Sequence, residues 1–356
     1  MGMPQSGLSR RFWQRVSSLS VSFTARLIGV AGPAAFQQRM ADELGRRKLA
    51  VGWSLGDEPQ GPILVIGGSR NLIGLRKARR EGRRIVQRLN GINWMHRRLR
   101  TGIRHYLRAE RNNLLLRWIR NRLADHVVYQ SQFAKDWWEE RYGPAPAPSS
   151  VVHNGVPLDV YSPEGKEAPP ADRIRVLMVE GNFAGGYEFG LSAGIDMAQR
   201  LALKTAQKVA LTIAGQVPSR VHQSIDSESE LIVDWRGVVE PADIPALDRS
   251  AHVLFAGDIH PACPNSVIEA MASGLPVVAY DTGALSELVS SDAGRVVPYG
   301  GDAWKLEPPD VNGLVEAGQA VLGEQDRFRA GARARAEEAF GLERTVDGYL
   351  AALQVG

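Results

Sequence analysis

Cysteine is almost missing from this 356-residue chain, with Cys263 as its one example. A single thiol excludes a disulfide framework and a cysteine-built zinc site, and it fits a reducing compartment. Long apolar runs are missing too, because no stretch approaches the roughly 18 residues that a membrane-spanning helix needs. Arg10 and Arg11 are followed by Phe12-Trp13-Gln14-Arg15 rather than by an apolar signal core, so we expect a cytoplasmic protein.

The overall composition is typical of a globular protein. Hydrophobic residues make up 44%, charged residues 23% and aromatic residues 7%, which excludes collagen, long disorder and coiled coil. The length predicts two domains. Residues 1–160 hold 27 Lys+Arg against 11 Asp+Glu, a balance of +16, whereas the rest of the chain holds 16 against 28, a balance of −12. Opposite signs predict two modules that meet different partners.

Short β-branched runs alternate with helical patterns along the whole chain. In the first half we expect strands over Val21–Val30, Leu49–Trp53, Pro62–Gly67, Arg83–Arg88, His126–Tyr129 and Ser150–His153. In the second half we expect them over Ile174–Val179, Lys208–Ala214, Leu231–Trp235, His252–Phe255, Pro276–Tyr280 and Arg295–Val297. Several runs are almost continuously apolar, as in parallel strands buried on both faces. The alternation predicts a doubly wound α/β fold.

Proline-dense polar sequence divides the two strand series. Pro144–Pro148, Pro157–Pro163 and Ala168–Pro170 flank one short strand and are typical of a linker. We therefore expect a basic Rossmann-like domain over residues 1–155 and a second Rossmann-like domain over 156–340. A C-terminal helix over 341–356 is expected to pack back towards the first domain.

The most informative segment runs from His260 to Gly283. Asn265 or Ser266 is expected to cap a short helix over Val267–Ser273, which Gly274 ends. A helix N-terminus just past the end of a strand offers free N–H groups and a partial positive charge, which suit a phosphate. Glu269 is placed to accept hydrogen bonds from a ribose diol. Ser266 to Glu269 equally fits a capping box, and the pattern leaves both interpretations open.

A glycine-rich loop, Gly29–Gly32, follows the first strand, with Pro33 suited to the first turn of a helix. The functional interpretation places Gly32 against donor phosphates or an acceptor. The simpler interpretation is a tight strand-to-helix turn.

Pro264–Ala279, continuing to Gly283–Val289, resembles the signature of family 4 glycosyltransferases with the GT-B fold. His153–Tyr161 is similar to the element with which that family crosses between domains, and Val127–Ala134 is similar to the strand and helix start before it. The resemblance implies two Rossmann-like domains around a cleft and transfer of a sugar from a nucleotide to a hydroxyl acceptor with retention. It also implies a hexosyltransferase-like enzyme that needs no metal or cofactor, and the chain has no Asp-X-Asp. By the match, Glu269 would hold the ribose, and the backbone of Asn265, Ser266 and Val267 would face phosphate or sugar.

The chain departs from the family pattern at three places. Pro261 stands where the family often has a sugar-binding glutamate. The loop after Val179 supplies Gly181 and Asn182 where the family has an arginine and a lysine, so backbone N–H groups of residues 181–186 are expected to hold the diphosphate as an anion-binding nest. The family's catalytic histidine is not evident, and Arg88 and Asn93 are the cleft candidates from the first domain. A non-catalytic GT-B binding protein or partner subunit is the alternative function.

Basic residues crowd the first domain. Residues 97–122 contain nine arginines against one acid, Glu110, with apolar residues between them, and a second cluster spans 76–84. A basic amphipathic helix of this kind binds anionic lipid, which would suit a lipid-linked or polysaccharide acceptor at the inner membrane face. A solvated helix face is the plain alternative, and nucleic acid is the least favoured because no motif accompanies the charge. Leu8, Phe12, Val16 and Leu19, with neighbouring arginines, form a second candidate contact.

Other single residues are expected to be structural. Cys263 has no second thiol and no base at a recognisable spacing, so it is expected to be a wall residue rather than a nucleophile. Trp94 and the pair Trp137-Trp138 are expected to pack rather than to stack on sugars. His96 follows the loop where the family has its histidine, and it is a candidate for that reason alone.

Overall fold

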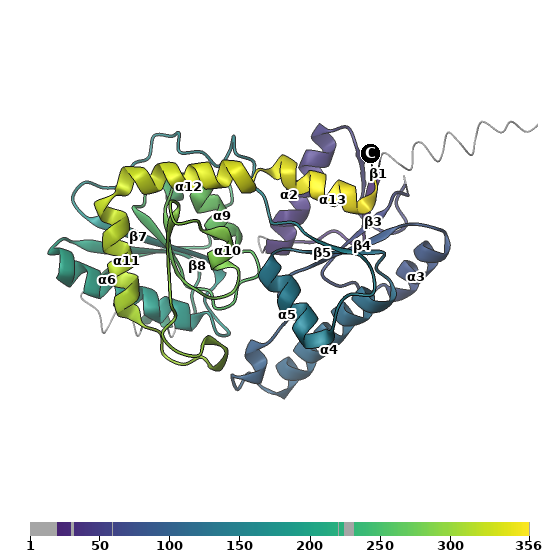
Figure 1. Ribbon diagram of the computed structural model, residues 1–356, viewed down its shortest axis with the longest axis horizontal. Helices are drawn as coiled ribbons and strands as arrows, with labels where there is room; N and C mark the ends of the chain where they lie inside the picture. The colour runs from purple at the N-terminus through teal and green to yellow at the C-terminus, as the bar shows by residue number, and fades with distance from the viewer. Residues whose placement is uncertain (1–19, 30–31, 59, 220, 224–230, 356) are drawn as a thin grey trace, which may run out of the picture.

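The computed structural model describes residues 20–29, 32–58, 60–219, 221–223 and 231–355, which form two six-stranded parallel sheets (Figure 1). The first sheet has the order β2-β1-β3-β4-β5-β6. Its strands are β1 Ser20–Phe23, β2 Ala50–Gly52, β3 Ile63–Ile66, β4 Ile85–Leu89, β5 His126–Tyr129 and β6 Ser149–Val151. They alternate with α2 Gly32–Arg46, α3 Leu72–Arg80, the 3-10 turn η1 Met95–Arg97, α4 Ile103–Arg122 and α5 Gln132–Tyr142.

The second sheet has the order β12-β11-β10-β7-β8-β9. Its strands are β7 Ile174–Asn182, β8 Val209–Gln216, β9 Ile232–Gly237, β10 Val253–Ala256, β11 Val277–Tyr280 and β12 Gly294–Val297. The helical elements of this half are α6 Glu188–Thr205, α8 Ile244–Arg249, α9 Asn265–Ala272, α10 Leu285–Leu288, the turn η2 Ala303–Lys305, α11 Val311–Gly323 and α12 Gln325–Ala339. The strand and helix alternation therefore confirms the predicted doubly wound α/β architecture.

The strand order determines where a ligand site is expected. In the first sheet the order reverses between β1 and β3, and in the second between β7 and β10. Because helices leave to opposite faces at such a reversal, a crevice opens outside the carboxyl ends of the strands. The loops after β4, β5, β7 and β10 lie at these ends, as do the N-termini of α2 and α9.

The chain crosses between the domains twice, at neighbouring places. Val156, after β6, donates its N–H to the Phe340 carbonyl oxygen at 2.9 Å, and the Val156 carbonyl oxygen accepts from the Leu342 N–H at 3.0 Å. Helix α12 packs on α9 in the second domain, and the next helix, α13 Leu342–Leu353, packs on α2 and β5 in the first (Figure 1). The C-terminal helix therefore completes the core of the first domain, through buried residues such as Val346 and Tyr349.

Several predicted boundaries differ from the structure. The strand expected over Val21–Val30 ends at Phe23, because residues 24–29 form bends and loop rather than pairing with a neighbour. Helix α9 begins at Asn265, two residues before the expected start. The predicted N-terminal amphipathic contact of Leu8, Phe12, Val16 and Leu19 lies outside the described residues.

Candidate active site

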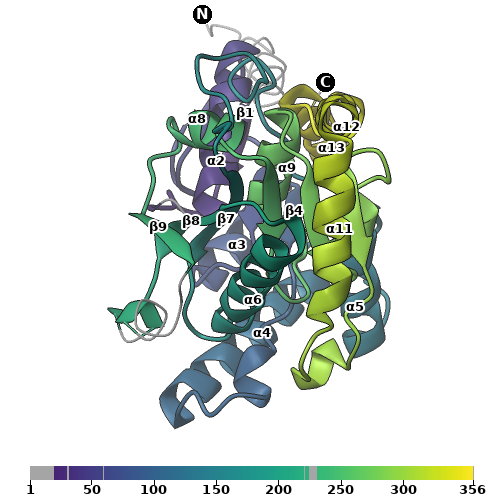
Figure 2. The ribbon, with the colours of Figure 1, turned by 90° about the vertical axis from the view of Figure 1, so that its left-hand side faces the viewer.

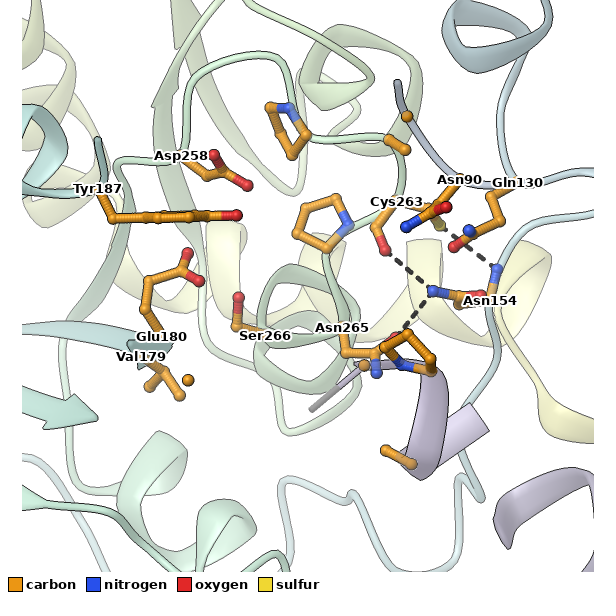
Figure 3. A pocket seen from close by; sticks show the side chains of 18 of the residues that line it. Asn90, Gln130, Asn154, Val179, Glu180, Tyr187, Asp258, Cys263, Asn265 and Ser266 are labelled. Carbon is orange, nitrogen blue, oxygen red and sulfur yellow. Dashed lines mark hydrogen bonds between the residues drawn. The ribbon is translucent and has the colours of Figure 1, made fainter. Parts of the chain in front are cut away.

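A cavity of about 550 Å³ lies between the two domains, and side chains of both line it. The first domain contributes Gly32, Arg88 and Asn93, and the second contributes Gly181 together with the start of α9. Figure 3 shows Glu180, Tyr187 and Asp258 on one side of the cavity and Asn90, Gln130 and Asn154 on the other. Asn265 and Ser266 lie between the two groups. The cavity thus brings together seven of the predicted residues, namely Gly32, Arg88, Asn93, Gly181, Asn265, Ser266 and Glu269.

Helix α9 presents its N-terminus to this cavity. Its N-cap residue is Pro264, which has no side-chain hydrogen bond to offer to the first turn. Asn265 and Ser266 line the cavity, whereas Val267 is completely buried in the hydrophobic core behind it. The role predicted for Val267 concerns its backbone and stays a prediction, whereas the predicted capping of the helix by Asn265 or Ser266 is wrong.

Glu269 faces the cavity and is ion-paired with the other domain. The Arg39 guanidinium, on α2, donates to Glu269 Oε1 at 2.5 Å and to the Tyr161 hydroxyl at 2.9 Å. The capping-box interpretation of Glu269 is wrong, because Ser266 lies inside the helix and the Glu269 carboxylate is engaged by Arg39. Burial raises the pKa of the neighbouring Tyr161 to about 12, so this phenol stays neutral.

In the loop over 181–186, the chain's own side chains occupy the N–H groups of residues 184–186. The Gly185 and Gly186 N–H groups donate to the Glu188 carboxylate at 3.3 and 2.7 Å. The Ala184 N–H donates to Asn182 Oδ1 at 3.0 Å. Gly181 lines the cavity and Asn182 is absent from its lining. The chain therefore satisfies the N–H groups of residues 184–186 itself, through Asn182 and the Glu188 carboxylate. Gly181 and Gly185 line the cavity, and the role of this loop at the diphosphate stays a prediction.

Asn93 joins the loop after β4 to α4 through hydrogen bonds with Asn113. Its backbone N–H and its Nδ2 both donate to Asn113 Oδ1, at 3.1 and 2.9 Å, and its carbonyl oxygen accepts from Asn113 Nδ2. Nearby, the His96 ring pairs with Glu110 at 2.8 Å. Hydrogen bonds from Arg97 lower the pKa of Glu110 to about 2, which keeps this carboxylate ionised.

Two carboxyl groups that the sequence analysis missed line the cavity. Glu180 stands at the end of β7 and Asp258 follows β10, the neighbouring strand, and Tyr187 lies beside both (Figure 3). Burial raises the pKa of Glu180, and burial raises the pKa of Asp258 to about 7. The signal that could have found them is position, since both follow adjacent parallel strands. This end of the cavity is therefore acidic where the family pattern has cations.

An aromatic cluster joins the two domains beside the cavity. The His260 ring stacks on Trp304 with 3.6 Å between centroids, and Trp94 and Phe133 of the first domain pack on His260. Trp137 packs on Trp304 at 5.0 Å. Trp138 is buried and donates to the Asn90 carbonyl oxygen, and burial raises the pKa of Cys263 to about 12. Trp138 therefore has the expected packing role, whereas Trp94 and Trp137 both pack and line the cavity. The raised pKa keeps the Cys263 thiol neutral.

Among the described residues, no three His, Cys, Asp or Glu side chains gather closely enough to hold a metal ion. No helix in the described part of the chain is long and apolar enough to cross a membrane.

Two family models match consecutive parts of the chain. Residues 68–160 match the model described as Glycosyltransferase Family 4, and residues 175–322 match the model described as Glycosyl transferases group 1. The chain is a divergent family 4 glycosyltransferase. No curated protein matches its sequence significantly.

Solved structures show that this glycosyltransferase has the GT-B fold. Anabaena Alr3699/HepE in complex with UDP-glucose is 17% identical, with a TM-score of 0.68 over 94% of this chain and 99% of that one. WaaG, a glycosyltransferase involved in lipopolysaccharide biosynthesis, is 13% identical, with a TM-score of 0.66 over 95% and 100%. Sucrose-phosphate synthase from Thermosynechococcus elongatus is 16% identical, with a TM-score of 0.63 over 98% and 93%.

Proposed function

We propose that this glycosyltransferase binds a nucleoside-diphosphate sugar in the interdomain cavity and transfers the sugar, a hexose, to a hydroxyl acceptor. The observation that carries the proposal is the placement of α9. Its uncapped N-terminus and Glu269 line one cavity, which the second domain shares with the first. A diphosphate leaving group develops negative charge, and preorganised N–H groups stabilise such charge without reorganisation. The neighbours solved with UDP and UDP-glucose support a nucleotide ligand.

The family supports retention of configuration and transfer without a catalytic metal or other cofactor. In this proposal Glu269 accepts hydrogen bonds from the ribose, and Asn265, Ser266 and the Val267 N–H face the phosphates. Glu180 and Asp258 lie at the far end of the cavity, where their oxygens suit sugar hydroxyls rather than phosphate.

We also propose that the acceptor is lipid-linked and that the first domain docks on an anionic membrane surface from the cytoplasmic side. Helix α4 exposes Ile103 by 71% and Leu107 by 61%. Arg100, Arg104 and Arg108 are exposed around them, and His105 and Ala109 of the same helix reach the cavity. Apolar side chains within a basic surface match an anionic lipid headgroup layer, and they would bring the cavity close to it.

Calorimetry with UDP, GDP and ADP, and with their 2′,3′-dideoxy forms, tests the nucleotide site. Glu269→Gln removes a charged acceptor for the ribose, so we expect at least a roughly tenfold weaker Kd for the ribonucleotide that binds. The dideoxy form should lose less affinity, since it has no hydroxyls to donate, and its loss reports the broken Arg39–Glu269 ion pair alone. Glu43→Gln is the matched control, because Glu43 is a buried carboxylate paired with Arg46 and Arg47 outside the cavity.

Equal losses for the ribonucleotide and its dideoxy form would contradict the ribose role. Nucleotide binding without transfer or donor hydrolysis would favour the non-catalytic binding protein. If no nucleotide binds to the unmodified chain, the proposed function is wrong.

A further inference from the structure

Arg88 is a buried cation without a carboxylate partner among the described residues. It stands near the end of β4, is 3% exposed, and lies over the Phe36 ring at 4.0 Å. Its Nη2 donates to Gln130 Oε1 and to Asn154 Oδ1, both at 2.9 Å. Burying a guanidinium among neutral partners costs folding free energy. A buried cation beside a cavity is therefore a candidate for a role in binding an anion.

Arginine offers donors only, and this fixes the orientation of both amides around it. Because Gln130 and Asn154 turn their oxygens towards Arg88, their amino groups point away from it. Gln130 is 3% exposed and lines the cavity, and its Nε2 has no acceptor among the described residues. The structure therefore holds a buried, unsatisfied N–H donor in a residue that lines the cavity.

The Asn154 amide in turn fixes the orientation of the Asn265 side chain at the start of α9. Asn154 Nδ2 donates to the Cys263 carbonyl oxygen and to Asn265 Oδ1, both at 2.9 Å (Figure 3). Since Asn265 Oδ1 accepts there, Asn265 Nδ2 remains a donor on its other side. A Cβ atom added to Gly32 would lie 3.9 Å from that nitrogen, so Asn265 reaches the first turn of α2.

Side-chain amides and helix N–H groups thus gather at one end of the cavity, where all of them are hydrogen-bond donors. Gln130, Asn265 and the first residues of α2 and α9 all line it, and both helices direct N–H groups and the positive ends of their dipoles there. The opposite end holds Glu180 and Asp258. A phosphate is therefore attracted to the amide end and repelled from the acidic end.

We propose that these amides form the phosphoryl subsite of the cavity, with Arg88 as the positioning residue that aligns them. Resting on the proposed function, the subsite takes the donor diphosphate and replaces the cations that the loop over 181–186 lacks. Gln130 Nε2 and Asn265 Nδ2 donate to phosphoryl oxygens, and Arg88 supplies positive charge from behind them.

Charge substitutions at the amides test this subsite. Gln130→Glu keeps an oxygen towards Arg88 but replaces the cavity donor with an anion. We expect the Kd for UDP, GDP or ADP, whichever binds the unmodified chain, to rise at least tenfold, while the Kd for the matching nucleoside changes less than twofold. The melting temperature should not fall, because Glu at 130 gives Arg88 a carboxylate partner. Asn154→Asp should weaken the diphosphate in the same selective way.

Asn121→Asp is the matched control, since Asn121 accepts from the buried Arg120 outside the cavity at 2.9 Å. It should leave both affinities unchanged. Diphosphate affinity within twofold of the unmodified chain in both Gln130→Glu and Asn154→Asp would overturn the subsite.

A separate outcome distinguishes the subsite from the proposed function. If the unmodified chain binds none of the three nucleotides, the transferase proposal fails, and inorganic pyrophosphate is titrated instead. Pyrophosphate binding that Gln130→Glu abolishes would support an anion subsite of another kind. Absence of pyrophosphate binding would overturn both proposals.

Discussion

Glu180 and Asp258 show how single residues set the electrostatics of this cavity. Each carboxyl is held by the backbone at the end of a parallel strand, and the strands are neighbours. Burial disfavours the charged form of each, and the Asp258 charge further raises the pKa of Glu180. Ionising both therefore costs folding free energy, and the pair holds a proton into the neutral range.

We expect the free energy of unfolding to depend on pH because of this pair. Because the folded-state pKa of Asp258 is raised to about 7, the folded chain binds a proton that the unfolded chain has already lost at pH 5–7. The free energy of unfolding should therefore fall as pH rises through this window. Asp258→Asn should raise it by about 1–3 kcal/mol at pH 8 and by much less at pH 4.

Chemical denaturation at the two pH values measures this difference. Glu316→Gln, on the exposed face of α11, is the control and should change stability alike at both. If Asp258→Asn raises the free energy of unfolding equally at pH 4 and pH 8, the shared-proton interpretation is wrong.

At the scale of elements, the start of α6 lies against the loop after β10. An added Cβ on Gly190 would meet the Gly257 carbonyl oxygen at 2.1 Å, and Gly257 precedes Asp258. Only a glycine lets the helix approach this closely, and the approach fixes the loop that carries the acidic end of the cavity.

Gly190→Ala should consequently destabilise the chain by about 1–3 kcal/mol, because backbone on both sides must move. Gly45→Ala is the matched control, since Gly45 lies in the last turn of α2 with open space around its Cβ position. Alanine there should raise stability by up to about 1 kcal/mol. Thermal melts of the two variants should therefore shift in opposite directions, and a stable Gly190→Ala chain would show that the helix can move away.

Helix α4 carries the proposed membrane surface, and it lies at the lower edge of the molecule in both ribbon views (Figures 1 and 2). Leu107→Asp should reduce co-sedimentation with vesicles containing phosphatidylglycerol several-fold, because it removes apolar area and adds a repelled charge. Leu203→Asp is the control on α6, where Leu203 is 84% exposed.

The dependence on salt and on lipid charge tests whether the binding to vesicles is electrostatic. About 0.5 M salt should weaken it, since exposed charges are screened beyond a few ångströms. Equal binding to neutral phosphatidylcholine vesicles, or retention on duplex RNA or DNA in place of vesicles, would contradict the lipid proposal.

At the scale of the whole molecule, several side-chain contacts between described residues hold the domains around the cavity. They include the Arg39–Glu269 ion pair, the aromatic cluster around Trp304, and the hydrogen bond from Asn154 to Asn265. Glu287 adds another, because it accepts from the Gln132 N–H and from the His153 ring. All lie between elements distant in sequence. They set how far apart the donors of the first domain and α9 stand, which decides whether one phosphate can reach both.

Trp304→Ala should loosen this arrangement, because it removes the rings' shared packing between the domains. We expect a larger radius of gyration by small-angle X-ray scattering and a several-fold weaker Kd for the nucleotide. Trp118→Ala, which removes a half-buried ring within the first domain, should leave both unchanged. An unaltered radius for Trp304→Ala would mean that the cluster does not hold the domains together.

The order of elements and the position of α9 could be predicted from the sequence, because strand runs, Gly274 and the segment from Pro264 to Val289 are local patterns. Glu180 and Asp258 were missed, since their significance depends on β7 and β10 lying side by side. The sequence pattern also gave no sign that a nearby acid, Glu188, accepts from the Gly185 and Gly186 N–H groups of the expected nest.

The sequence by itself determined that this chain has two α/β domains and a signature helix whose N-terminus can face an anion. Only the tertiary structure decided which side chains share the cavity. Arg88, Gln130 and Asn154 belong to separate elements of the first domain and the crossing, and Asn265 to the second. Their hydrogen-bond directions follow from an arginine that can only donate, and that constraint exists only once folding has placed the four side chains together.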